Sequence, residues 1–411
     1  MKTTKLLLTL PLLATGIHAQ DAAAPAAADT DSITAAFQAG KASFNARLRY
    51  EDAEAAGLQD SEAFTARARV GYETGVWNGL KALFEFEGTA ALNDDDNFDG
   101  FGTSGTHTTI ADPENAELNR AQLVWSNGDN TVIAGRQRIQ LGNERFVGNV
   151  GWRQNEQTYD GVALVSTAID NVTLVYGWVD QVNRIFGNEA GGALERLHTN
   201  AHAVNLIYSG WELGTITLYD YYLDVDNAGI FSSNSFGASL SIANALGEGS
   251  DYTLGLYAEI AKQEDVADNT TAYDANYYHI AGTLSRDIFS VGLGYEVLGS
   301  DGGTFAFQTP LATGHKFNGF ADVFLVTPAS GLEDFYVSAS CQLEKVKLAA
   351  YYHEFDSEEG STDLGDEWDL VATYKYNDNW SGTAKYADYS QGDATSPVDT
   401  QRFSIQIDYK F

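Results

Sequence analysis

The chain ends on the stretch Arg402-Phe403-Ser404-Ile405-Gln406-Ile407-Asp408-Tyr409-Lys410-Phe411, in which polar and apolar residues alternate without a break. Successive side chains of an extended strand point to opposite faces of the sheet. One face of this stretch therefore holds only Phe, Ile and Tyr, and the other holds Arg, Ser, Gln, Asp and Lys. The sequence predicts a final strand with one apolar and one polar face.

The same alternation recurs along the chain in runs of about ten residues. In residues 66–73, Arg67, Arg69 and Glu73 share the polar face, and residues 79–87 repeat the pattern. Strands of soluble sandwiches average about five or six residues, whereas strands that cross a membrane need about nine to eleven. After residue 19 no apolar run reaches the ~18 residues of a membrane-spanning helix, so the pattern favours a membrane barrel.

Connections between the candidate strands alternate in length. Short connections are rich in Asn, Asp and Gly, the residues of tight turns, and the long ones include 89–116, 140–156, 183–199 and 299–331. Short periplasmic turns and long outer loops are typical of bacterial outer-membrane barrels. The candidate strands begin near Ser43, Ala63, Leu80, Glu117, Thr131, Gln157, Val172, Asn200, Gly214, Asn234, Asp251, Ala275, Ile288, Leu332, Val346, Asp366, Trp380 and Thr400. We predict an all-β, antiparallel, up-and-down transmembrane β-barrel of about 18 strands; a count of 16 also fits.

The final strand must pair with the first one, near residues 44–50, because an open sheet edge cannot be satisfied in lipid. A Phe-terminated last strand also resembles the signal read by barrel-assembly machinery. We expect the bacterial outer membrane as location, with the lipid bilayer and lipopolysaccharide as surroundings. Trp77, Trp125, Trp178, Trp211 and Trp380 lie near strand ends, as an aromatic girdle requires.

The first residues read as an export signal. Lys2 and Lys5 precede a short apolar run and small residues, so we expect a signal peptide at 1–19, a disordered Ala/Pro-rich leader at 20–42 and the barrel at 43–411. Cys341 is the single cysteine and excludes an internal disulfide. The net charge of −33 argues against nucleic acid as a partner.

Arginine is concentrated in the first part of the chain. Of the 13 arginines, nine precede Asp160. The alternation places seven of them on polar strand faces, together with several glutamates: Arg47, Arg49, Arg67, Arg69, Arg120, Arg136 and Arg138. Two hypotheses compete. The arginines either stiffen the wall by pairing with glutamate, or form a basic track that guides anionic solutes.

Two stretches are more specific than the rest. One runs from Gly135-Arg136-Gln137-Arg138 through Trp152-Arg153 to Asp160, and the other is His315-Lys316-Phe317-Asn318-Gly319, followed by Asp322. With the strand pattern, they resemble the alginate-export family of outer-membrane barrels. The resemblance implies an 18-stranded barrel with a basic conduit for an acidic polysaccharide or smaller anionic solutes. The matching positions are Arg136, Arg138, Arg153, Asp160, His315, Lys316 and Asp322. The chain departs from the family in its net acidity and its many lumen glutamates.

Two loops carry further hypotheses. Segment 299–331 is too apolar for a freely solvated loop, so it folds into the lumen as a constriction, packs over the rim or adds a strand. Asp95, Asn97 and Asp99 have the first spacings of a calcium loop, but Thr106 stands where the closing Glu is expected, so a solvated acidic loop is favoured over a Ca²⁺ site.

The sequence shows no catalytic elbow or metalloprotease helix, so we expect neither an enzyme nor a cofactor. We predict an outer-membrane channel or porin that passes small or anionic solutes, such as acidic sugars or polysaccharide. The alternative is a structural or adhesive outer-membrane barrel with a closed lumen.

Overall fold

The structure is a computed structural model that describes residues 29–93, 98–100, 105–246 and 250–411. The expected signal peptide and the first part of the expected leader lie outside the described residues, as do Asp95 and Asn97 of the calcium hypothesis.

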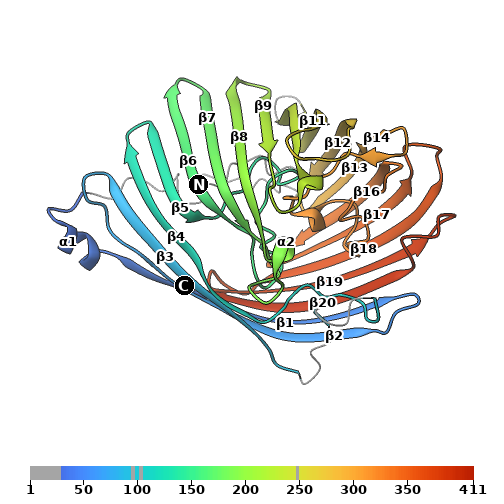
Figure 1. The fold of residues 1–411 in the computed structure, drawn as a ribbon, viewed down its shortest axis with the longest axis horizontal. Coiled ribbons are helices and arrows are strands. Elements are labelled where there is room, and N and C mark those ends of the chain that lie inside the picture. Colours follow the sequence, from blue (N-terminus) through green and yellow to red (C-terminus); the bar gives the residue numbers. More distant parts are fainter. Residues whose placement is uncertain (1–28, 94–97, 101–104, 247–249) are drawn as a thin grey trace.

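Eighteen antiparallel strands form one closed sheet in which each strand pairs with its neighbours in the chain (Figure 1). The strands are β1 Lys41–Ala55, β2 Ser61–Glu73, β3 Leu80–Ala91, β4 Asn115–Asn127, β5 Asn130–Gln137, β6 Thr158–Ile169, β7 Val172–Asn183, β8 Arg196–Trp211, β9 Gly214–Leu223, β10 Ser233–Ala245, β11 Tyr252–Asp265, β12 Asp274–Arg286, β13 Phe289–Leu298, β16 Leu332–Leu343, β17 Val346–Asp356, β18 Asp363–Lys375, β19 Trp380–Gln391 and β20 Thr400–Lys410. Smaller elements are α1 Ile33–Gln38, α2 Gly192–Glu195, η2 Gly229–Phe231, η3 Gly314–Lys316 and the hairpin of β14 Ser300–Asp301 with β15 Phe305–Ala306.

The predicted fold class and the count of 18 are confirmed. Seven strands begin at the predicted residue, and the largest shift is at β8, which begins at Arg196 instead of near Asn200. Its first residues, Arg196 to His198, pair with the end of β7 beyond a register shift between Val179 and Gln181. The alternation predicted only the regular part of the strand.

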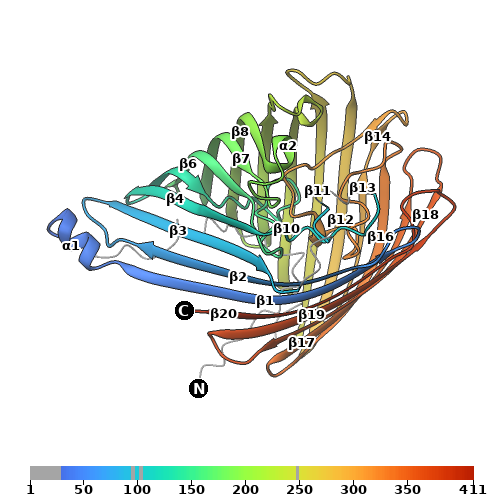
Figure 2. The ribbon, with the colours of Figure 1, turned by 60° about the horizontal axis from the view of Figure 1, so that its bottom comes forward.

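The barrel closes between β1 and β20, as predicted (Figure 2). Their register runs from Asn45 opposite Lys410 to Ala55 opposite Thr400. Just beyond it, Phe44 and Phe411 exchange two backbone hydrogen bonds of 3.2 and 3.0 Å. These bonds leave no open edge at the seam, which is the condition for a sheet surrounded by lipid.

The two faces of the wall differ in chemistry as the alternation predicts. Apolar side chains are exposed on the outside around the barrel, including Val70 on β2, Leu123 on β4, Ile280 on β12 and Ile407 on β20. The polar side chains between them point inward. No helix in the described part of the chain has the length and apolar composition to span a membrane.

The prediction of a disordered leader up to residue 42 is wrong for its last part. Residues 33–38 form α1, and β1 begins at Lys41. The Ser32 side chain accepts a hydrogen bond from the N–H of Ala35 and caps this helix. The helix is tied to the turn after β2, where the N–H of Gly75 donates to the carbonyl of Ala36 at 2.8 Å.

Two connections turn into the barrel instead of standing outside it. The first is 138–157, between β5 and β6, which the loop-length pattern had placed on the outer side. The second is 307–327, part of the segment for which a constriction was one of three hypotheses. The two pack against each other: the N–H of Gly148 donates to the carbonyl of Leu311 at 2.9 Å, and that of Thr313 to the carbonyl of Glu144 at 3.1 Å. We call 138–157 the first inward segment and 307–327 the second.

Candidate functional site

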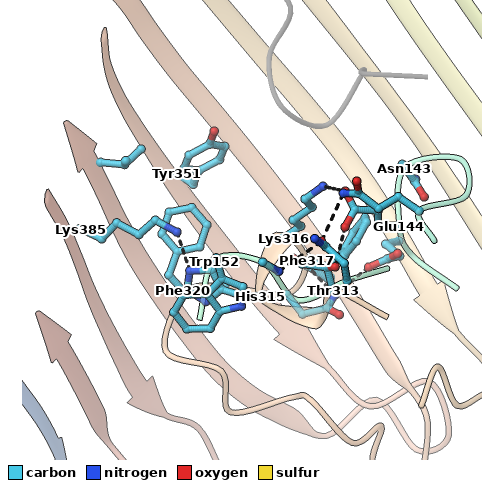
Figure 3. Close-up of a pocket in the computed structure, with 18 of the residues that line it drawn as sticks. Asn143, Glu144, Trp152, Thr313, His315, Lys316, Phe317, Phe320, Tyr351 and Lys385 are labelled. Carbon is cyan, nitrogen blue, oxygen red and sulfur yellow. Dashed lines mark hydrogen bonds and ion pairs between the residues drawn. The ribbon is translucent and has the colours of Figure 1, made fainter. Parts of the chain in front are cut away.

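A cavity of about 500 Å³ lies inside the barrel, between the two inward segments and the walls of β2, β12, β13 and β16–β19 (Figure 3). Its lining mixes aromatic rings with charged groups of both signs. The cations are Arg69, Arg138, Lys316 and Lys385, and the carboxylates are Glu144, Glu156, Glu296 and Asp334. Of the predicted site residues, the cavity brings together Arg69, Arg138, His315 and Lys316.

Three predicted arginines on the wall hold the backbone of the first inward segment. Arg47 donates to the carbonyl of Trp152 at 3.0 Å, and Arg49 donates to the same oxygen at 2.9 Å. Arg67 donates to the carbonyl of Gln154 at 3.3 Å. A charge-assisted hydrogen bond to a buried carbonyl satisfies both groups. These arginines therefore fix the segment to the wall, and none of the three lines the large cavity.

Buried ion pairs neutralise most of the other predicted arginines. Arg120 meets Glu85 through two hydrogen bonds of 2.8 and 2.9 Å. The others are Arg69 with Glu87, Arg138 with Glu156 at 2.7 Å, and Arg153 with Glu51 at 2.9 Å. Glu51, Glu87, Arg153 and Glu156 are each less than 5% exposed. The geometry therefore favours the structural hypothesis for this set over a continuous basic track.

The charged state of this network follows from its contacts. Burial acts to raise the pKa of Glu156, but Arg138 and Arg69 outweigh it and hold the pKa well below its usual range. Burial acts to lower the pKa of Arg153, and Glu51 and Asp112 raise it instead. Both groups are therefore ionised, and loss of one partner would leave a buried charge unpaired, at a cost of ~3–5 kcal/mol.

Arg136 and Asp160 pair with each other away from the cavity. Two hydrogen bonds of 2.7 and 2.9 Å join the guanidinium to the carboxylate, and Gln181 donates to the same carboxylate at 3.2 Å. Neither residue is among those that line the large cavity. The strand pattern had put Arg136 beside Arg138, but the strand ends at Gln137 and the two side chains take different partners.

The second inward segment meets the first through a stack of rings. Trp152 lies 3.5 Å from His315, centroid to centroid, and His315 lies 4.9 Å from Phe320. His315 Nδ1 is 2.9 Å from Asp322 Oδ1, and Lys385 Nζ is 2.6 Å from His315 Nε2. On the far side of the cavity Lys316 pairs with Glu144, which also accepts from the Thr313 hydroxyl at 2.6 Å (Figure 3).

Burial is the main cause that lowers the pKa of His315, to about 3, and the nearby Lys385 lowers it further. Burial acts to raise the pKa of Asp322, but His315 and Arg153 outweigh burial and hold this pKa below its usual range. His315 is therefore neutral at ordinary pH. Because its Nδ1 faces a carboxylate, the proton sits there, and Nε2 accepts from Lys385.

The acidic side of the cavity is also fully paired. Asp334 is 2.9 Å from His353 Nδ1 and accepts from the Asn318 amide at 3.0 Å. Glu296 forms an ion pair of 2.9 Å with Arg145 and accepts from the Tyr277 hydroxyl at 2.6 Å.

Sequence reasoning missed Lys385, His353, Glu296 and Asp334. Each lies on the polar face of a predicted strand, so alternation alone marks it as facing the lumen. These four residues lie outside the arginine-rich strands and outside the two motifs, so no other sequence feature distinguishes them. The calcium hypothesis is untested, and among the described residues no cluster of three metal-ligating side chains is formed.

The comparisons with known proteins agree with the barrel. No family model and no curated protein sequence matches the chain, so the resemblance to the alginate-export family stays a prediction. Several solved structures are similar to this chain. OccAB4 of Acinetobacter baumannii matches with a TM-score of 0.73 and 13% sequence identity, over 90% of this chain and 98% of that one. OccK8 (OprE) of Pseudomonas aeruginosa matches with a TM-score of 0.69 and 15% sequence identity, over 91% of this chain and 98% of that one. The structure of Pseudomonas aeruginosa OpdK with vanillate matches with a TM-score of 0.69 and 12% sequence identity, over 91% of this chain and 99% of that one.

The chain has the fold of the Occ proteins. One of them, OpdK, is described as an outer membrane protein. With its closed sheet of 18 strands and its exposed apolar exterior, this chain has the architecture of a transmembrane β-barrel.

Proposed function

We propose that this protein is a selective outer-membrane channel for small solutes, with a preference for anions. The observation that carries the proposal is the cavity of about 500 Å³ at the level where the two inward segments narrow the lumen. A barrel of 18 strands encloses far more space than its own wall side chains fill. Its lumen is narrowed by two dedicated segments, and they leave a pocket of the size that encloses a small ligand.

The lining supports a small organic anion. Arg69, Arg138, Lys316 and Lys385 bring positive charge to the cavity, and Phe317, Phe320 and Tyr351 bring rings that pack against an apolar body. The Occ structure of OpdK with vanillate, a single-ring carboxylate, is consistent with a solute of this size. An acidic polysaccharide, the solute implied by the alginate-export resemblance, is the weaker candidate because ion pairs lock both inward segments in place.

The test is ion conduction by the purified protein in planar bilayers. We expect discrete conductance steps and a reversal potential in a KCl gradient that shows anion preference. Arg138→Met should shift the reversal potential toward cations, since Glu156 then faces the cavity with less compensation. Arg136→Met should shift it less, because Arg136 does not line the cavity. Equal shifts would contradict the assignment of the cavity as the selective part.

A structural barrel with a closed lumen is the second candidate. It is favoured by the tight packing on the arginine side, where the space between Arg49, Trp152 and Arg402 measures only about 10 Å³. The same bilayer recordings distinguish the two. Absence of conductance from protein that migrates as a folded barrel would support the closed lumen and overturn the channel.

A further inference from the structure

One of the four cations that line the cavity differs from the others in its partners. Arg69, Arg138 and Lys316 each form an ion pair with a carboxylate, namely Glu87, Glu156 and Glu144. Lys385, on β19, forms no ion pair with any carboxylate of the described residues. No carboxylate therefore contacts the Lys385 ammonium directly, and Asp322, Asp369 and Glu51 act on its charge only from beyond ion-pair distance.

The ammonium of Lys385 is held by groups without net charge. Its Nζ donates to His315 Nε2 at 2.6 Å and lies 4.6 Å from the ring centroid of Phe320 and 5.3 Å from that of Trp152 (Figure 3). Aromatic faces attract a cation without neutralising it. An ammonium has three donors, and within the described part of the chain only the bond to His315 is formed, so two donors stay available.

Asp322 explains why His315 accepts this bond. The carboxylate accepts a hydrogen bond from the protonated Nδ1 at 2.9 Å, so the lone pair of Nε2 faces Lys385. Arg153 lies 3.5 Å from Asp322 and fixes it in turn. A carboxylate in the place of His315 would orient Lys385 equally well but would cancel its charge. The neutral imidazole orients the ammonium and leaves its charge for a ligand.

We propose that Lys385 is the anion-binding residue of the cavity and that Asp322 and His315 act as positioning residues that aim it. The ligand class is a small organic monoanion with an apolar ring. The charged oxygen of this ligand accepts hydrogen bonds from the two available donors of Lys385, and the ligand's ring lies against Phe320 and Tyr351. These two side chains pack edge to face, with 5.6 Å between their ring centroids. This inference rests on the proposed channel function.

The test uses benzoate as the probe of channel current. We expect benzoate to block the wild-type current in a concentration-dependent way, and benzamide, which has the same ring and no charge, to block far less. Lys385→Met should weaken benzoate block about tenfold or more, the loss expected for a charge-assisted hydrogen bond. Lys81→Met is the matched control, because Lys81 lies on β3, pairs with Glu73 at 2.9 Å and does not line the cavity. It should leave the block unchanged.

The positioning role has its own readout. His315→Leu removes the acceptor and should weaken benzoate block, whereas His315→Gln supplies an amide oxygen and should restore most of it. Heat-modifiable electrophoretic migration checks that each variant is a folded barrel. If benzoate and benzamide block the wild-type channel equally, the inference is overturned and the channel function stands. The same holds if benzoate blocks the wild type and Lys385→Met equally. Folded wild-type protein that does not conduct at all would overturn the channel function itself.

Discussion

Buried charge in this barrel is concentrated where the first inward segment meets the wall of β1–β4. Arg47, Arg49 and Arg67 bind main-chain oxygens there, and Arg153 reaches back to Glu51. Taking such groups out of water is costly unless each finds a partner. Their density in the sequence therefore marks an attachment surface, while the charge that is free to act on a solute is elsewhere, at Lys385.

His315 should make the attachment of the second inward segment depend on pH. Its pKa is about 3 when docked, mainly because of burial, and ~6.5 when exposed. The detached form binds the extra proton, so docking is fully stable above ~6.5 and weakens as pH falls, by about 1.4 kcal/mol per unit. Asp322, with a depressed pKa, adds to the loss only below its ordinary range near 3.8.

Hydrogen exchange can follow this change at the N–H groups of Lys316 and Phe317, which donate to Thr313 and Gly314. We expect protection, corrected for the intrinsic pH dependence of exchange, to fall between pH 7 and 4.5. His315→Gln should be much less sensitive to pH. Wild-type protection that stays constant over this range would contradict the buried neutral state of His315.

At the scale of elements, the strands were predictable and the paths of the long connections were not. Alternation is a local property, and it located Leu80, Val172 and Trp380 as strand starts because each follows a turn-forming residue. The sequence also predicts a long connection at 140–156. Its inward path depends on contacts such as Phe146 with Tyr277, which join distant parts of the chain.

The same limit applied to the site. Arginine density led to the wall of the first strands, and motif resemblance led to His315 and Lys316. Lys385 has no motif and reaches His315 across 70 residues of sequence. Only closure of the barrel brings β19 beside the second inward segment. The contact between Lys385 and His315 could therefore not be predicted from the sequence.

Phe146 should be the main anchor of the first inward segment on the wall opposite the arginines. Its ring lies 5.2–5.8 Å from those of Tyr219, Tyr221, Tyr277 and Phe307. Phe146→Ala removes these contacts, at a cost of up to ~3–5 kcal/mol for a packed phenylalanine, and should loosen the segment on that side. We expect larger single-channel conductance and weaker ion selectivity in planar bilayers.

Phe236→Ala gives the matched control, because Phe236 lies on β10 with its side chain 42% exposed on the outer face. Its loss should leave conductance unchanged. An unaltered conductance in Phe146→Ala would mean that the arginine contacts alone hold the segment.

At the scale of the whole molecule, closure at the β1–β20 seam separates two solvents, lipid outside and water or polar side chains inside. A single strand shows both, since on β12 Ile280 is 63% exposed on the outside while Thr283, three residues later, points inward and is half-buried. Lysine on the lipid face near the middle of the membrane costs ~2–4 kcal/mol, and much less in the lumen. Ile280→Lys should therefore lower the free energy of unfolding from lipid vesicles by about that amount, measured by tryptophan fluorescence in guanidinium, and Thr283→Lys should lower it by well under half as much. Equal losses would show that the two faces are not divided between lipid and lumen, and the membrane barrel would have to be abandoned.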